Sequence, residues 1–353
     1  MGKQDVGDLE KIRLGVEGWL QAAMPDRPGL RVDDLNFPEA SGESSVTLLL
    51  DIAWADAGVD RVVLRMAPPT SQVFEQHDLL MQYEMMSLMH DEGIPAPKLI
   101  GYEADPSWLG SDFYVMGFSQ GRIPPDNPPF AIVSWVKDSL SDAERATMWR
   151  NGLETLAAIH RIDIEKHDLS RLPRAGPGES ILAQEIRTFD SMFKAELRDS
   201  VDARILEAWD ALLASVPSDG EIGFCWGDSR VGNVVFDGLA PVAILDWEMA
   251  NISDPLTDLA WWVWIDKCNS EGLGVPRLGG LPEPKEIYAS WHELTGRSIE
   301  NIAWFELFAA TRYAIILERK FIAMRESNPE LGIPLNFVAP FLPDLIAAAR
   351  KTV

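Results

Sequence analysis

The chain has 353 residues, enough for one large domain or two moderate ones, and its apolar and charged fractions are typical of a soluble globular protein. Its net charge of −24 disfavours binding to nucleic acid or to an anionic membrane surface. No apolar run approaches the roughly 18 residues of a membrane span, and residues 1–24 have helical apolar spacing, unlike a signal peptide. We therefore expect a cytoplasmic protein whose acidic surface either attracts cationic small molecules or serves solubility alone.

Runs rich in Val, Ile and Leu follow this first helix and are separated by turn residues, which predicts strands. A helical segment over residues 72–92 interrupts them and ends before Gly93 and Pro95. Together these runs predict a small, mostly antiparallel sheet with one main helix. The expected strands cover residues 30–37, 45–55, 60–67, 96–105 and 111–119.

The proline-rich segment 121–130 fits neither a helix nor a central strand, so it reads as a connection between lobes. Beyond it the chain is mainly helical, with expected helices over residues 142–162, 180–197, 201–216, 255–265, 284–295 and 299–324. The pattern predicts an α+β protein with a β-rich lobe over residues 1–116, a larger, mostly helical lobe over residues 117–353, and a cleft between them. The sequence carries no signature of oligomeric state.

The chemistry-bearing side chains cluster around two short apolar runs, NVVF and VAIL, which the turn Asp237-Gly238 joins into a predicted β-hairpin. Asp228 and Asn233 precede the first strand, and Asp246 follows the second. An amide and a carboxylate are oxygen ligands that suit Mg²⁺ shared with substrate phosphates, and a separate Asp can accept a proton from a hydroxyl group. The hairpin therefore predicts a site for phosphoryl transfer.

The zinc alternative finds no support in the cysteines and histidines. Cys225 and Cys268 form no CxxC pair, and the five histidines have no HExxH spacing. Two isolated cysteines are typical of a reducing compartment.

These motifs resemble the aminoglycoside phosphotransferase family, with its choline kinase-like members, the small-molecule relatives of protein kinases. The resemblance rests on GDSRVGN, then ILDWE, then DPLTDLAWW. It implies a bilobal protein-kinase-like fold in which Asp228 is the catalytic base, Asn233 and Asp246 are magnesium ligands, and Asp258 braces the catalytic loop. Trp226 occupies the position of the family's loop-orienting His. The form WGDSRVGN looks closer to the branch linked to acyl-CoA dehydrogenases than to the antibiotic-resistance enzymes.

Upstream motifs extend the resemblance into the nucleotide-binding lobe. The segment SGESSV resembles the phosphate-covering loop, with Gly42, Ser44 and Ser45 as expected contacts. In VVLRM, Arg65 takes the place of the phosphate-binding Lys or Arg, and Glu84 takes the place of its ion-pair partner. The segment FYVMGFS resembles the hinge that binds adenine through backbone groups, which implies Met116, Gly117, Phe118 and Ser119.

These residues also admit purely structural interpretations. Asp228, Asn233 and Asp246 could each serve alone as a turn, cap or strand-end residue, but the complete set at this spacing favours function. Arg65 in an apolar strand also fits a surface strand. The adjacent Trp261, Trp262 and Trp264 are expected to belong to the core and not to a substrate cage.

A different class of enzyme is suggested by residues 117–121, GFSQG, which match the GxSxG nucleophile turn of α/β-hydrolases. That turn must lead from a strand into a helix, and the prolines that follow argue against one. A kinase-like protein that binds nucleotide without turning it over is the other alternative. Since Asp228, Asn233 and Asp246 are all present, the sequence favours an ATP-dependent or GTP-dependent, Mg²⁺-requiring O-phosphotransferase acting on a small-molecule aminoglycoside, amino alcohol or hydroxyacyl compound.

Overall fold

A computed structural model describes residues 8–38, 46–55, 58–67, 78–193, 201–218, 220–327 and 335–351, and the chain divides into two units. The first unit comprises Met1–Gln120 and Val242–Glu248, and the second comprises Gly121–Pro241 and Met249–Val353. The predicted boundary between the lobes lies after residue 116. The short segment that carries Asp246 packs with the first unit, although it lies far along the chain.

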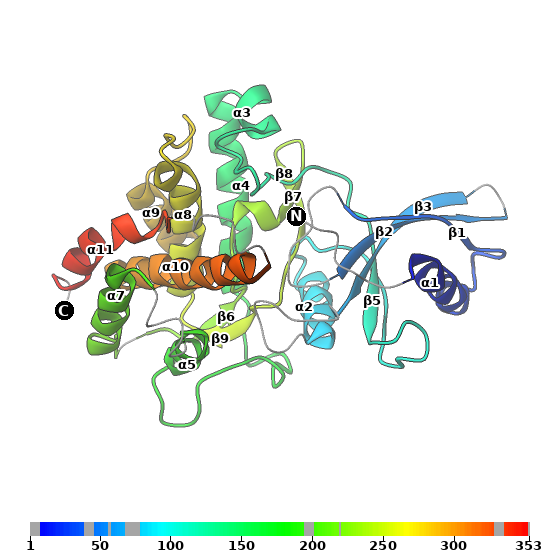
Figure 1. The fold of residues 1–353 in the computed structure, drawn as a ribbon, viewed down its shortest axis with the longest axis horizontal. Coiled ribbons are helices and arrows are strands. Elements are labelled where there is room, and N and C mark those ends of the chain that lie inside the picture. The colour runs from blue at the N-terminus through cyan, green and yellow to red at the C-terminus, as the bar shows by residue number, and fades with distance from the viewer. Residues whose placement is uncertain are drawn as a thin grey trace. The chain divides into compact units, whose positions relative to one another are not determined.

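A five-stranded antiparallel sheet forms the centre of the first unit (Figure 1). Along β2 the side chains alternate, with Val46, Leu48 and Leu50 buried, as expected for a strand whose one face is covered. The predicted strands and their antiparallel pairing are confirmed. In sheet order the strands are β1 (Arg31–Asn36), β2 (Val46–Trp54), β3 (Gly58–Met66), β5 (Phe113–Gly117) and β4 (Leu99–Glu103).

Helix α1 (Leu9–Ala23) packs on this sheet because its apolar residues share one face. Val16 and Leu20 belong to the same buried cluster as Leu48 and Leu64. The second helix, α2 (Leu79–Asp91), begins where the Asp78 side chain accepts a hydrogen bond from the Met81 N–H at 2.8 Å. The earlier part of the predicted helix, residues 72–77, lies outside the described residues.

The second unit is mainly helical, as predicted (Figure 1). Helix α8 is buried on all sides from Leu256 to Asp266, which identifies it as the central helix and confirms that Trp262 and Trp264 belong to the core. The short helices α3 and α11 were not predicted. In chain order the helices are α3 (Trp135–Ser139), α4 (Asp142–His160), α5 (Ala183–Met192), α7 (Ala203–Ala214), α8 (Leu256–Ser270), α9 (Pro284–Thr295), α10 (Ile302–Ser327) and α11 (Leu342–Ala349).

Two short strand pairs accompany these helices. Strands β7 (Val234–Asp237) and β8 (Ala240–Ile244) pair as the predicted hairpin. Strands β6 (Gly223–Cys225) and β9 (Asn251–Ser253) form a second pair that the sequence analysis missed. Three 3-10 turns complete the described elements: η1 (Val231–Asn233), η2 (Glu271–Leu273) and η3 (Ala339–Phe341).

The hydrolase interpretation is excluded by the local backbone. Strand β5 ends at Gly117, and the next helix, α3, begins only at Trp135. A nucleophile turn needs a helix directly after its strand, so the GxSxG match is incidental.

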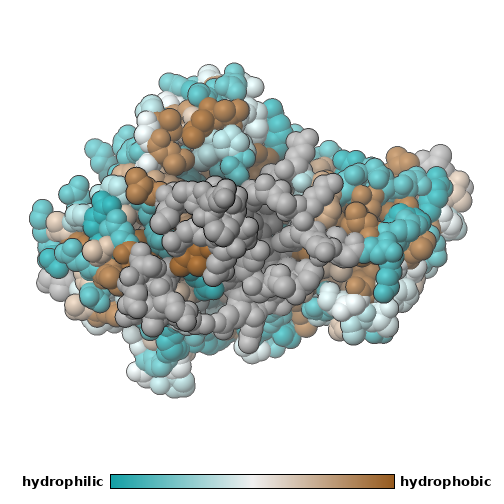
Figure 2. Space-filling view, viewed as in Figure 1, coloured by the Kyte–Doolittle hydropathy of each residue, from teal (hydrophilic) through white to brown (hydrophobic). Residues whose placement is uncertain are grey.

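On the face shown in Figure 2, hydrophilic and hydrophobic residues are interspersed, and hydrophobic residues are visible in the region of α3 and over the sheet of the first unit. Val133, directly before α3, is 57% exposed, and Ile123 is 42% exposed. Exposed apolar residues of this number are normal for a soluble surface. Among the described residues, the structure contains no helix long and apolar enough to cross a membrane.

Candidate active site

The loop that carries Asp228 follows β6 and depends on a glycine. Gly227 has a φ of +91°, a conformation that L side chains rarely adopt. A Cβ added there would lie 2.1 Å from the carbonyl oxygen of Met249, so the backbone at this point has no room for a side chain. The close approach sets the direction in which the Asp228 side chain leaves the loop.

Asp228 accepts hydrogen bonds on both carboxylate oxygens. The amide nitrogen of Asn233 donates to Oδ2 over 2.7 Å, which confirms that these two predicted site residues lie together. The Arg230 Nε also donates to Oδ2, at 2.9 Å, and the Trp261 indole N–H donates to Oδ1 at 2.8 Å. The side chain of Asp228 is 14% exposed, so these donors replace most of its water.

These contacts keep Asp228 ionised. Burial alone would raise the pKa of the carboxyl group, but the nearby Arg230 charge and the hydrogen bonds from Arg230, Trp261 and Asn233 lower that pKa below its ordinary value. Asp228 is therefore an acceptor of hydrogen bonds at neutral pH, able to orient a hydroxyl group.

Asp258, three residues before Trp261 on α8, holds the backbone of the same loop. Its carboxylate accepts hydrogen bonds from the backbone N–H of Trp226 at 2.6 Å and of Gly227 at 2.8 Å, and its carbonyl oxygen accepts one from the Ser229 hydroxyl at 2.7 Å. Asp258 thus makes the bracing contacts that the family resemblance implied. Helix α8 positions both the backbone of the loop and the side chain of Asp228.

His160, at the end of α4, completes this brace. Its Nε2–H donates to Asp258 at 3.1 Å, and its Nδ1 accepts from the Trp291 indole N–H at 2.8 Å. An indole nitrogen can only donate, so the ring is the neutral Nε2–H tautomer. Burial lowers the pKa of His160, which agrees with a neutral ring. His160 is therefore the outer support of the loop.

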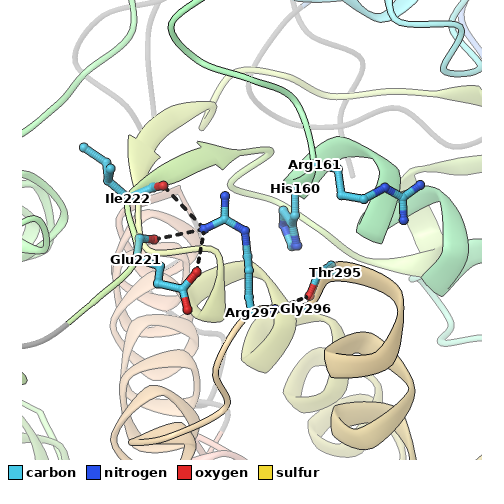
Figure 3. Close-up of a pocket in the computed structure, with 7 residues that line it drawn as sticks. All are labelled: His160, Arg161, Glu221, Ile222, Thr295, Gly296 and Arg297. Carbon is cyan, nitrogen blue, oxygen red and sulfur yellow. Dashed lines mark hydrogen bonds and ion pairs between the residues drawn. The ribbon is translucent and has the colours of Figure 1, made fainter.

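A surface pocket lies on the His160 side of this brace (Figure 3). The Arg297 guanidinium spans one wall, where it donates to the carbonyl oxygens of Glu221 and Ile222 and forms an ion pair with the Glu221 carboxylate at 3.5 Å. None of the predicted site residues lines this pocket. His160 is the lining residue that also belongs to the brace of the Asp228 loop.

In the first unit, Arg65 and Asp246 form a second cluster. Arg65 lies on β3, where its NH1 group donates to the Thr47 hydroxyl at 3.3 Å and its NH2 group lies 3.6 Å from the Asp246 carboxylate. Burial would lower the pKa of Arg65, but the neighbouring Tyr114, Asp246 and Glu248 raise it above its ordinary value. The structure thus gives Arg65 an ion pair with Asp246 that the sequence analysis did not expect, and its pairing with Glu84 of α2 stays a prediction.

Asp246 has a φ of +62°, one of two positive φ values among the non-glycine residues that the structure describes. An L residue in this region is uncommon, and such positions concentrate at functional sites. The conformation turns the chain directly after β8, and the next residue, Trp247, is buried with its indole N–H donated to the Ile244 carbonyl. Asp246 therefore has an uncommon backbone conformation, and its role as a magnesium ligand stays a prediction.

The other residues of the expected nucleotide site are partly described. Glu84 is half-buried on α2, and Met116 and Gly117 end β5. Two of the hinge N–H groups have backbone partners. The Gly117 N–H donates to the carbonyl oxygen of Lys98 at 2.7 Å, and the Phe118 N–H donates to the carbonyl oxygen of Arg61 at 3.0 Å. Gly42, Ser44 and Ser45 lie outside the described residues.

Sequence reasoning missed three residues at the Asp228 site: Trp261, Arg230 and Asp126. Trp261 and Trp262 lie three and four residues after Asp258, so both spacings place a tryptophan on the Asp258 face of the helix and the sequence does not single out Trp261. Arg230 forms a further ion pair with Asp126, which lies in the proline-rich segment. Nothing in that segment's sequence indicates the contact.

Comparisons with known proteins identify the family of this chain. The family model described as "Phosphotransferase enzyme family" matches residues 43–281, and this chain belongs to that family, the APH family. Helix α8 and the loop of Asp228 both lie inside the matched region.

The chain is similar to several particular proteins in sequence and in fold. The chain is 31% identical over 256 residues, 68% of its length, to human acyl-CoA dehydrogenase family member 11, and 27% identical over 89% of its length to the mouse protein. It spans 40% of the mouse protein. Among solved structures, an aminoglycoside phosphotransferase-like protein from Ralstonia eutropha gives a TM-score of 0.69 at 18% identity, covering 98% of each chain. Choline kinase LicA from Streptococcus pneumoniae gives 0.60 at 13% identity, covering 97% of this chain and 99% of its own. These neighbours confirm the kinase-like fold.

Proposed function

We propose that this protein is a small-molecule O-phosphotransferase that moves the γ-phosphoryl group of a Mg²⁺-bound nucleotide to an acceptor hydroxyl group. The observation that carries the proposal is the ionised Asp228, fixed by Asn233, Arg230 and Trp261 on a loop that Asp258 braces. A carboxylate held in this way can orient an acceptor hydroxyl group by accepting a hydrogen bond from it. Phosphoryl transfer depends chiefly on such positioning and on charge neutralisation.

Asp228 acts on the acceptor hydroxyl group. Its low pKa makes it a weak base, which suits a loose transition state in which the hydroxyl group loses its proton late. The carboxylate holds the hydroxyl oxygen in line with the phosphoryl group and takes the proton as the new P–O bond forms, while the bond from the γ-phosphorus to the bridging oxygen breaks and the nucleoside diphosphate leaves. Arg230 keeps Asp228 ionised and therefore keeps it a hydrogen-bond acceptor.

Asn233 and Asp246 fit Mg²⁺ by their donor chemistry. The Asn233 amide nitrogen is directed at Asp228, so its amide oxygen is the atom left for a cation. Asp246 supplies a carboxylate in a fixed, uncommon backbone conformation. Amide and carboxylate oxygens are ligands that Mg²⁺ prefers, and the bound ion would neutralise charge on the phosphates.

The nucleotide contacts come from the first unit. Arg65 would hold the α- and β-phosphates, with Glu84 on α2 as its further partner and with Gly42, Ser44 and Ser45 covering them. Met116, Gly117, Phe118 and Ser119 would receive the adenine. Since the N–H groups of Gly117 and Phe118 already have partners, we assign the adenine contacts to hinge carbonyl oxygens and to Ser119. ATP is the proposed donor and GTP the alternative, since related folds were solved with ADP and with GDP.

The acceptor that we propose first is a hydroxyacyl thioester. Two relatives that match two thirds or more of the chain are named for an acyl-CoA dehydrogenase, and 60% of the mouse relative lies outside the matched part. Amino alcohols and aminoglycosides are the second choice, from the names of the structural neighbours. A panel that contains hydroxyacyl-CoA esters, choline, kanamycin and a macrolide separates these classes.

The test is phosphoryl transfer from radiolabelled ATP to this panel, with Asp228→Asn as the variant and Asp237→Asn as its matched control. Asp237 is exposed at the end of β7, so its replacement should leave turnover unchanged. Loss of the base should lower kcat by about 10²-fold or more while nucleotide affinity stays within about threefold. Wild-type protein that binds ATP and phosphorylates no member of the panel, or an Asp228→Asn variant with full turnover, would contradict the proposal.

A further inference from the structure

Trp261 makes a direct contact with the predicted base that packing does not require. Its indole N–H donates to Asp228 Oδ1 over 2.8 Å, and the side chain is 3% exposed. Indole has a single polar group and it can only donate. The contact therefore always presents a donor to Asp228, whatever the state of the carboxylate.

The hydrogen bonds on Asp228 are unequally divided between its oxygens. Among the described residues, Oδ2 accepts two hydrogen bonds, from Asn233 and Arg230, whereas Oδ1 accepts one, from Trp261. Each carboxylate oxygen has two lone pairs. The remaining lone pair thus belongs to Oδ1, the oxygen whose other lone pair Trp261 occupies.

The position of the indole is itself fixed on both sides. The Arg312 guanidinium lies over the Trp261 ring at 4.7 Å, and the Tyr313 ring meets it edge-on with centroids 6.0 Å apart. Arg312 is anchored by an ion pair with Glu185 at 3.1 Å, and both side chains are buried. Trp261 therefore has little freedom to move, and neither does the oxygen that it contacts.

We propose that Trp261 is a positioning residue for phosphoryl transfer, which directs the free lone pair of Asp228 Oδ1 toward the acceptor hydroxyl group. This inference rests on the proposed function. The hydroxyl proton would pass to Oδ1, while Oδ2 stays bound to Asn233 and Arg230. The role differs from core packing because it depends on one N–H group and not on the volume of the ring.

Trp262 offers a matched control on the same helix. It is also fully buried, and within the described part of the chain its indole N–H has no hydrogen-bond partner. Its ring packs edge-on against the Trp149 ring, and it donates no hydrogen bond to Asp228. Trp261→Phe and Trp262→Phe remove the same atoms from neighbouring positions, and only the first removes a donor to the base.

The experiment compares kcat and KM of the two variants with the wild type, using the acceptor on which the wild type is active. A hydrogen bond to a charged group is strong enough that its loss should lower kcat about tenfold or more in Trp261→Phe. KM for nucleotide should stay within about threefold, and Trp262→Phe should keep kcat within about twofold. Equal kcat in both variants, whether retained or reduced, would overturn the positioning role and assign Trp261 to packing.

Two further measurements test the role of Trp261 if Trp261→Phe folds poorly or if the protein transfers no phosphate. Site-specific replacement of Trp261 by its benzothiophene analogue removes the N–H group and keeps the bicyclic shape, and it should reproduce the loss of kcat. The indole ¹H–¹⁵N resonance that disappears in Trp261→Phe should move upfield in Asp228→Ala, and an unmoved resonance would refute the contact itself. If the wild type transfers phosphate to no acceptor, the proposed function fails and the positioning role fails with it, whereas an active wild type with an unaffected analogue overturns the positioning role alone.

Discussion

His160 and Asp258 form a buried hydrogen bond of 3.1 Å that joins the end of α4 to the brace of the Asp228 loop. Because Trp291 donates to the other ring nitrogen of His160, both polar atoms of this ring have fixed partners. The loop is therefore supported by a chain of three buried side chains, and its position depends on each of them.

We expect His160→Ala to lower the free energy of unfolding by about 2–4 kcal/mol, because Asp258 loses one of its buried hydrogen-bond donors and the Trp291 indole N–H loses its acceptor. It should lower kcat more than it raises KM for nucleotide, since the loop moves while the first unit is intact. Trp291→Phe removes only the indole N–H that donates to His160, so it should lower both the free energy of unfolding and kcat by less. Urea denaturation and steady-state kinetics of the two variants measure this, and a larger effect of Trp291→Phe on kcat would contradict the proposed order.

Asp254 predicts a pH dependence of stability. Burial raises the pKa of this carboxyl group from its ordinary 3.8 to about 6, although it accepts a backbone hydrogen bond from Leu256 at 2.9 Å. A group whose pKa is higher in the folded state binds its proton more tightly there. It therefore adds stability below its unfolded pKa, and this contribution is lost as the pH rises through about 6.

Asp254→Asn stays neutral at every pH and should remove that dependence. Relative to the wild type, the variant should gain about 2–3 kcal/mol of unfolding free energy as the pH rises from about 4 to about 7. Urea denaturation of both proteins across this range measures the difference, in which the other titrating groups cancel. A constant difference would show that Asp254 has the same pKa in both states.

Features that depend on neighbouring residues could be predicted from the sequence, whereas contacts between distant residues could not. The hairpin, the contact between Asp228 and Asn233, and the strand position of Arg65 follow from short-range patterns, because turn residues and alternation determine them. The contact of Arg230 with Asp126 joins residues more than a hundred positions apart, through a proline-rich segment without regular structure. No local pattern encodes such a contact.

The contact of Trp261 with Asp228 and the packing of the Asp246 segment also could not be predicted from the sequence, each for a physical reason. Helix α8 is buried all round, so its apolar pattern does not show which of its tryptophans faces the loop, and Trp261 could not be distinguished from Trp262. The Asp246 segment packs with the first unit, which brings it to Arg65. The family resemblance predicts Glu84 as the partner of Arg65, and the packing of the chain adds Asp246, a contact between distant positions that no local pattern shows.

Asp246 should be needed for the metal-bound form of the nucleotide. We expect Asp246→Asn to weaken binding of Mg²⁺-nucleotide by about tenfold or more, because a neutral amide is a poorer cation ligand than a carboxylate. Binding of nucleotide in the presence of EDTA should change by less than about threefold, since Arg65 remains to contact the phosphates. Titration calorimetry with and without Mg²⁺ gives both affinities. Equal weakening in the two conditions would show that Asp246 acts through Arg65 and not through a cation.

Gly227 offers the most stringent test of the loop geometry. Its φ is +91°, and a Cβ at this position would lie 2.1 Å from the Met249 carbonyl oxygen, which leaves no room for alanine. Gly227→Ala should therefore displace the loop, lowering the free energy of unfolding by about 3 kcal/mol or more and kcat by about 10²-fold. Gly238 in the hairpin turn is the control, because its φ is +59° and a Cβ there would meet open space. Gly238→Ala should cost only about 1 kcal/mol and leave kcat unchanged, and equal losses in the two variants would mean that backbone strain alone, and not the packing against Met249, sets the position of Asp228.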